Sequence, residues 1–374
     1  MQTISFHNPI CQGADPWMFP FEGKFCLCCT ASRSIVLWRA ADPTKIHDEE
    51  SIVAFEPEEG HEWSHDLWSP EIHYFAPEDF GEAHAGWYLF IACDDGQNVN
   101  HRMYVLKSED PHSPFAHYAN PVTGVRNVPE KFASPVDPDF NTAWCCGQTI
   151  LRARGNVYAM WVDEVGRQTE NFHQRVRLAK LTNPYTAETA HVIIRPTEDW
   201  EMHGFGMGKD GKIRPRVVEG GTAIYGDDGE VYLTYSGSGY WTPYYALGQL
   251  TLQGDPEKIE DWKKEKTPIF SMSDKVFGCG HASFFKDAAG DRFICYHAYL
   301  SREKGAKRHV FLERYRIEDG KIIIGIFVAL MCFCLWLMQY NSMKRNMAQS
   351  AANKQTEMMQ KMMLWMFPIM YIFS

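Results

Sequence analysis

Five segments of this 374-residue chain repeat one pattern: a Gly or Gly-Asp turn followed by an aromatic-rich run of strand length. They begin at Gly23, Gly86, Gly155, Gly229 and Gly290 and read GKFCLCCT, GWYLFIAC, GNVYAMWV, GEVYLTYSG and GDRFICYHA. Intervals between 61 and 74 residues are too irregular for a solenoid, but they suit similar units with loops of different length. The chain is therefore expected to fold as five related β units.

A second strand-like segment precedes each repeat, and these segments read ADPWMF, WSPEIHYF, CCGQTILRA, VEGGTAIYG and GHASFFKD. Each contains a polar residue or a glycine near its start: Asp15, Glu71, Gly147, Glu219 and His281. Helical periodicity is almost absent before residue 320. The pattern predicts an all-β, five-bladed β-propeller whose innermost strands converge on one axis, so these residues would meet at the mouth of a central funnel.

The composition argues against nucleic-acid binding and favours a cytoplasmic protein. A formal net charge of -10 gives no basic face for counterion release from phosphates. The eleven cysteines form neither a paired CxxC ladder nor a Cys/His finger, so we interpret them as small, reduced, apolar residues. The N-terminus, MQTISFHNPI, lacks the basic and apolar regions of a signal peptide, so we expect a cytoplasmic location.

Two of the funnel residues are carboxylic acids that suit one chemistry. Breaking a glycosidic bond needs one carboxyl to protonate the leaving oxygen and another to act on the anomeric carbon or a water. Asp15 and Glu219 come from different units, and Glu219 stands between Val217-Val218 and Gly220-Gly221. A partly desolvated carboxyl there would have a raised pKa, as an acid requires. Carboxylates that cap strand ends remain the alternative.

The motifs GADPWMF, DLWSPEIHYF, VVEGGTAIYGDDGEVYLTYSGSG, YYALGQL and GCGHASFFKDAAGDRFICYHAY resemble glycoside hydrolase family 43 over residues 5 to 320. The resemblance implies a five-bladed propeller that hydrolyses α-L-arabinofuranosyl or β-D-xylosyl linkages of oligo- or polysaccharides with inversion. By motif, Asp15 corresponds to the general base and Glu219 to the general acid. No cofactor is required, but His281 resembles a histidine near which some members hold a cation, often Ca²⁺.

One position departs from the family. A further aspartate usually lies on the inner strand of the third blade, where it orients the acid and tunes its pKa, but the matching residue here is Gly147. Asp139, on the loop that leads to this strand, is a weak candidate to replace it; an Asx-Pro turn is the alternative interpretation. The gap supports a second hypothesis, a carbohydrate-binding pseudoenzyme on the same propeller.

Four residues near these motifs are candidates for binding sugar. Trp17 and Trp68 could stack on sugar rings, and Glu71 and His281 could contact substrate hydroxyls. Core or rim packing is the alternative for the two tryptophans, and structural hydrogen bonding near the funnel is the alternative for Glu71.

The composition changes abruptly after Lys321. Ile322 to Met338 reads IIIGIFVALMCFCLWLM, without a charge, and predicts a membrane-spanning helix over residues 322–341. The sequence thus divides into a propeller (1–321), this helix and a Met-rich helical tail (342–374).

The tail contains MMQKMMLWMFPIMYIFS, which is similar to part of YidC-type membrane insertases. The other helices of that family are missing from the sequence, so the resemblance does not imply insertase activity. It leaves two interpretations: a propeller tethered to a membrane through residues 322–341, or two unrelated gene pieces joined near Lys321.

Overall fold

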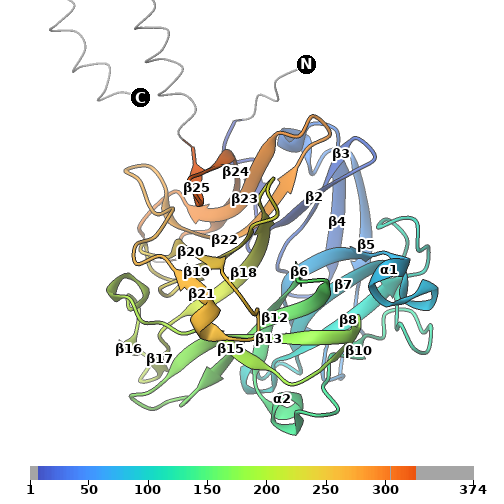
Figure 1. Cartoon of the computed structure of the whole chain (residues 1–374), viewed down its shortest axis with the longest axis horizontal. Helices are drawn as coiled ribbons and strands as arrows, with labels where there is room; N and C mark the ends of the chain where they lie inside the picture. The colour runs from blue at the N-terminus through green and yellow to red at the C-terminus, as the bar shows by residue number, and fades with distance from the viewer. Residues whose placement is uncertain (1–6, 304, 326–374) are drawn as a thin grey trace, which may run out of the picture. The chain divides into compact units, whose positions relative to one another are not determined.

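The computed structural model describes residues 7–303 and 305–325, which form a ring of β-sheets (Figure 1). Five sheets follow one another along the chain, and neighbouring strands are antiparallel. The first sheet contains β2 (Trp17–Phe21), β3 (Lys24–Cys28), β4 (Ile35–Ala40) and β5 (Glu50–Phe55). The second contains β6 (His65–Phe75), β7 (Gly86–Asp94), β8 (Arg102–Ser108), β9 (Tyr118–Ala119) and β10 (Glu130–Lys131).

The remaining three sheets have the same plan. The third contains β11 (Cys145–Ala153), β12 (Asn156–Val165), β13 (His173–Asn183), β14 (Thr186–Ala187) and β15 (His191–Ile194). The fourth contains β18 (Val218–Tyr225), β19 (Val231–Gly237), β20 (Ala246–Leu252) and β21 (Trp262–Lys264). The fifth contains β22 (Phe277–Lys286), β23 (Arg292–Tyr299), β24 (Arg308–Glu318), β25 (Lys321–Ile324) and β1 (Cys11–Gln12).

Short elements connect these strands. A separate hairpin, β16 (Gly206–Met207) with β17 (Ile213–Arg214), leads into the fourth sheet. The helical turns are α1 (Pro77–Phe80), α2 (Pro138–Thr142), and the 3₁₀ turns Pro43–Lys45, Glu82–His84, Asn98–Asn100, Asp199–Glu201 and Ile259–Asp261.

The first strand of each sheet lies at the centre of the ring. β2, β6, β11, β18 and β22 contact one another in cyclic order, and β22 contacts β2. This arrangement confirms the predicted all-β, five-bladed propeller. The inner part is largely apolar: β7 is buried almost throughout, whereas the more peripheral β13 alternates buried and half-buried residues.

The N-terminal strand closes the ring. β1 pairs with β24 of the last sheet, with Cys11 opposite Val310 and Gln12 opposite His309. The next residues lead directly into β2 of the first sheet, so the first and fifth blades are joined by main-chain hydrogen bonds. This closure places Asp15 beside residues of the fifth blade.

β25 corrects a boundary predicted from the sequence. Residues 322–324 do not begin an apolar helix but belong to a strand paired with β24, in which Ile322 and Ile324 are buried. The amide of Ile322 also donates to Oε1 of Gln249 at 3.0 Å. The rest of the predicted span, residues 326–341, and the tail 342–374 lie outside the described residues. Within the described part, none of the helices is long and apolar enough to cross a bilayer.

The cysteines behave as the sequence predicts. All nine that the structure describes are free thiols, and eight of them are buried. Burial raises the pKa of these thiols, for Cys26 to about 12. The thiols therefore stay protonated, as small apolar residues in the packing.

Candidate active site

The five inner strands share a backbone feature at the mouth of the funnel. β6, β11, β18 and β22 each contain a register shift typical of a β-bulge. One residue at each bulge, and one just before β2, has a left-handed backbone: Asp15 (φ 52°), Ser69 (47°), Gly147 (63°), Gly220 (58°) and His281 (46°). These five residues all line one pocket.

This backbone equivalence refines the alignment made from the sequence. In the fourth blade the residue that matches Asp15 and His281 is Gly220, and Glu219 precedes it. In the second blade it is Ser69, two residues before Glu71. Gly220 suits its position because a Cβ there would lie only 3.1 Å from the ring of His281.

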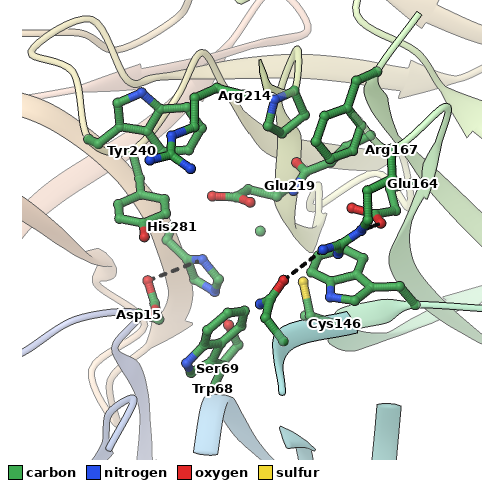
Figure 2. A pocket seen from close by; sticks show the side chains of 18 of the residues that line it. Asp15, Trp68, Ser69, Cys146, Glu164, Arg167, Arg214, Glu219, Tyr240 and His281 are labelled. Carbon is green, nitrogen blue, oxygen red and sulfur yellow. Dashed lines mark hydrogen bonds and ion pairs between the residues drawn. The ribbon is translucent and has the colours of Figure 1, made fainter. Parts of the chain in front are cut away.

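A pocket of about 910 Å³ opens at these bulges (Figure 2). Asp15, Glu219 and His281 all line it, so the structure brings together side chains from blades one, four and five. Figure 2 shows Asp15 and Glu219 on different sides of the same cavity. The aromatic lining residues are Trp68, Trp144, Phe172, Tyr240 and Trp241.

Asp15 is held as a carboxylate. Its Oδ1 lies 3.1 Å from Nη1 of Arg308, 3.2 Å from Nδ1 of His297 and 3.4 Å from Nδ1 of His281. The hydroxyl of Thr30 donates to Oδ2 at 2.5 Å. Burial acts to raise the pKa of Asp15, but Arg308 and the two histidines outweigh it and hold that pKa well below its usual value.

Glu219 has the opposite electrostatic environment. Burial, and then the negative charge of Asp15, raise its pKa to about 7. The hydroxyl of Tyr245 donates to Oε1 of Glu219 at 3.0 Å, and this bond and one from Gln174 partly offset the rise. One carboxyl of the pocket is therefore ionised near neutrality and the other is half protonated, as a base and an acid require.

Comparison with known proteins identifies the family of the chain. The model of the glycosyl hydrolases family 43 matches residues 6–322. The chain belongs to this family. The fold resembles the crystal structure of an α-L-arabinofuranosidase from Lactobacillus brevis with a TM-score of 0.69 and 22% identity, covering 85% of this chain and 95% of that one.

Two curated relatives match segments of this family 43 chain. Alpha-L-arabinofuranosidase B of Pyricularia oryzae is 25% identical over 240 residues, which is 62% of this chain and 42% of the relative. The membrane protein insertase YidC of Bifidobacterium longum is 76% identical over 56 residues, 15% of this chain and 17% of that protein. The chain thus spans less than half the length of either relative. The second match confirms the resemblance to a YidC fragment.

The family's third carboxylate has no counterpart at Gly147. A Cβ built there would meet only Cγ2 of Val162, at 3.9 Å, so the backbone faces open pocket. Asp139 does not fill the gap, because it is exposed in the first turn of α2 and lies outside the pocket lining.

The four predicted sugar-binding residues divide into two pairs. Trp68 and His281 line the pocket, and the ring of Trp68 lies 4.1 Å from that of His101. Trp17 and Glu71 are not among the lining residues. The indole of Trp17 donates to the carbonyl of Ile72 at 2.9 Å.

Trp17 and Glu71 both contact His73. The ring of Trp17 lies 4.6 Å from that of His73, whose Nε2 is 2.7 Å from Oε2 of Glu71. These contacts agree with the structural interpretation that the sequence left open, and the geometry gives no support for substrate contact by either residue.

The cation expected near His281 has few protein ligands to hold it. The imidazole contacts Asp15, and among the described residues no group of three or more His, Cys, Asp or Glu side chains is arranged for a metal ion. A cation there would need water for most of its ligands. It stays a prediction, and we assign it no role in the chemistry.

Several lining residues were missed by sequence reasoning. Glu164 of β12 pairs with Arg167, whose Nη1 donates to Oδ1 of Asn98 at 3.1 Å. Alternation along β12 could have indicated Glu164, because it shares a strand face with Val162, beside Gly147. Arg308 carried no such signal, since it reaches Asp15 only through the closure of the ring.

Proposed function

We propose that this protein is an inverting glycoside hydrolase for arabinose- or xylose-containing oligo- or polysaccharides. The observation that carries the proposal is the placement of two carboxyl groups in one pocket, where their surroundings shift their pKa values in opposite directions. The pKa of Asp15 is well below its usual value and that of Glu219 is about 7. Family membership and the arabinofuranosidases among the matches support the substrate class.

In the proposed reaction Asp15 is the general base. Its carboxylate accepts a proton from a water molecule, which attacks the anomeric carbon. Arg308 and Thr30 fix the two oxygens of Asp15 and keep it ionised until that transfer. The inverted configuration of the product follows from attack on the face opposite the leaving group.

Glu219 is the general acid of this reaction. It donates its proton to the glycosidic oxygen, which leaves as a hydroxyl group, while Tyr245 holds Oε1 in place. The pocket walls supply Trp68, Tyr240 and Trp241 as surfaces for sugar rings.

A carbohydrate-binding pseudoenzyme is the second candidate, and the observation that favours it is Gly147. A third carboxylate would keep Glu219 protonated by repulsion between like charges. Here burial and Asp15 already raise the pKa of Glu219 to about 7, so the raised pKa of the acid does not require a carboxylate at position 147. This electrostatic result favours the enzyme.

The test is hydrolysis of aryl α-L-arabinofuranosides and aryl β-D-xylosides, with the anomeric configuration of the released sugar followed by NMR. We expect turnover with inversion, and losses of at least about 10³-fold in Asp15→Asn and Glu219→Gln. Asp139→Asn is the matched control, since this carboxylate is exposed outside the pocket. Sugar binding without turnover in the wild type would favour the pseudoenzyme.

A further inference from the structure

The pocket carries a surplus of positive charge although the chain as a whole is acidic, at -10. Its acidic lining residues are Asp15, Glu164 and Glu219. Its basic lining residues are Arg167, Lys212, Arg214 and Arg308. The distribution of these charges, rather than their sum, indicates what else the pocket can bind.

The two deeper basic residues are already neutralised. Arg308 pairs with Asp15, with 3.1 Å between Nη1 and Oδ1, and Arg167 pairs with Glu164. Glu219 is uncharged whenever it is ready to act as an acid. The cations left over are therefore those at the rim.

Lys212 and Arg214 are these cations. Arg214 meets Asp210 at 2.7 Å, but the two side chains are 41% and 46% exposed, so water screens this pair. Lys212 is exposed and forms no ion pair with any residue that the structure describes. An anionic group entering the rim would meet positive charge that no buried carboxylate neutralises.

Both rim cations belong to the segment that leads to the general acid. Lys212 immediately precedes β17 of the β16–β17 hairpin and Arg214 ends that strand. The chain then reaches Glu219 within five residues of Arg214. Figure 2 shows Arg214 on the Glu219 side of the pocket and Asp15 across from it. Because the acid protonates the leaving oxygen, the leaving part of the substrate extends on this side.

The hairpin is anchored to the third blade rather than free. The side-chain amide of Gln168 donates to the carbonyl of Ile213 at 3.2 Å and accepts from its amide at 2.9 Å. Arg216 donates to the carbonyl of Glu170 at 3.1 Å and lies 3.6 Å above the ring of Phe205. The rim cations are thus attached to a fixed backbone, which lowers the entropic cost of using them for binding.

We propose that Lys212 and Arg214 form a subsite for the carboxylate of a uronic acid in the leaving part of the substrate. A guanidinium presents paired donors to a carboxylate, and an ammonium adds a second, mobile charge. The inference rests on the proposed function, and it narrows the substrate class to oligosaccharides that carry a uronic acid.

The experiment uses one oligosaccharide in two forms. The acidic form is a xylo-oligosaccharide with one arabinofuranosyl and one glucuronosyl branch; the neutral form is the same molecule with the carboxyl reduced to a primary alcohol. We expect the full-length enzyme to show a kcat/KM about fivefold or more higher for the acidic form. That preference should fall as ionic strength rises to about 0.5 M, because salt screens exposed charges.

Three substitutions on the hairpin locate the effect. Lys212→Ala and Arg214→Ala should each reduce the acidic-to-neutral ratio of kcat/KM about threefold, and the double variant should bring it near one. Lys209→Ala is the matched control, because Lys209 lies on the same hairpin but does not line the pocket, and it should retain the wild-type ratio. An unchanged ratio in the double variant overturns the proposal, as does a wild-type ratio of about one.

A binding measurement separates this inference from the proposed function. Calorimetry with the Glu219→Gln variant compares the Kd of the acidic and neutral forms without hydrolysis. If the wild-type protein hydrolyses neither form but the variant binds the acidic form more tightly, through Lys212 and Arg214, the hydrolase proposal fails and the subsite stands. If both forms are hydrolysed and bound equally, the subsite is wrong and the hydrolase proposal stands.

Discussion

The hydroxyl of Tyr245 donates a hydrogen bond to Oε1 of Glu219 at 3.0 Å. The same ring is stacked on His297, with an interplanar angle of 3°, and Nδ1 of His297 lies 3.2 Å from Asp15. One tyrosine thus spans the surroundings of both carboxyl groups. Gly280 leaves room for it, since a Cβ there would meet the ring at 2.3 Å.

Tyr245→Phe should shift the alkaline limb of the profile of kcat/KM against pH to higher pH. The hydroxyl donates to the ionised form of Glu219 and lowers its pKa, so its removal raises that pKa above about 7. We also expect kcat to fall about 10-fold, because the acid loses its orientation. The measurement is kcat/KM against pH, with the buried Tyr118→Phe, whose hydroxyl bonds to Pro114 instead, as control. A lower kcat with an unmoved limb would show that Tyr245 only packs.

The plot of kcat/KM against pH for the wild type should itself be bell-shaped, and it should extend far to the acidic side. Activity requires ionised Asp15 and protonated Glu219, so it rises through a pKa well below the usual aspartate value and falls through a pKa of about 7. Arg308→Gln should move the acidic limb upward, since the guanidinium lowers the pKa of Asp15. Arg302→Gln, at an exposed cation outside the pocket lining, is a control that should leave both limbs in place. An acidic limb unmoved in Arg308→Gln would contradict the assignment of Asp15 as the base.

The sequence predicted the five blades because each carries its own local signal, a Gly-led turn before a β-rich run. It also predicted that Asp15, Glu219 and His281 meet, since equivalent strand ends converge in a propeller. The alignment of Glu219 with Asp15 was one residue out, because the bulge residue is Gly220, and an extra residue in a strand leaves no clear mark in one sequence.

Contacts that depend on long-range closure could not be predicted. Arg308 reaches Asp15 across almost the whole chain because β1 pairs with β24. Glu71 lies on an inner strand like the pocket residues, but its carboxylate contacts His73 two residues further along the same strand face, and Trp17 packs on that imidazole. The boundary at Lys321 failed because three isoleucines fit an apolar helix and a strand equally well, and only pairing with β24 decides between them.

Gly220→Ala should damage the site in two ways, by straining the backbone at position 220 and by pushing against the ring of His281. A left-handed residue other than glycine costs about 1 kcal/mol, and the added Cβ would lie 3.1 Å from the ring of His281. We expect lower thermal stability and a loss of kcat/KM of about 10-fold or more, through displacement of His281 from Asp15. Gly229→Ala is the control, because it has a similar φ of 84° and nothing within 4 Å of its Cβ. Equal effects of the two substitutions would mean that only the backbone matters.

Gly147→Asp tests what a third carboxylate does in this pocket. Asp15 adopts a φ of 52° at the equivalent position, and the φ of 63° with open space at Gly147 should accept an aspartate at a cost of about 1 kcal/mol. A carboxylate there adds negative charge near Glu219, so the pKa of the acid should rise and the alkaline limb should move upward. The control is Gly147→Asn, which has the same shape without the charge and so separates steric from electrostatic effects. Thermal melts should give both variants the same stability. If the asparagine variant moves the limb as far as the aspartate variant does, the pKa of Glu219 does not respond to charge at this position, and the electrostatic account of the acid is wrong.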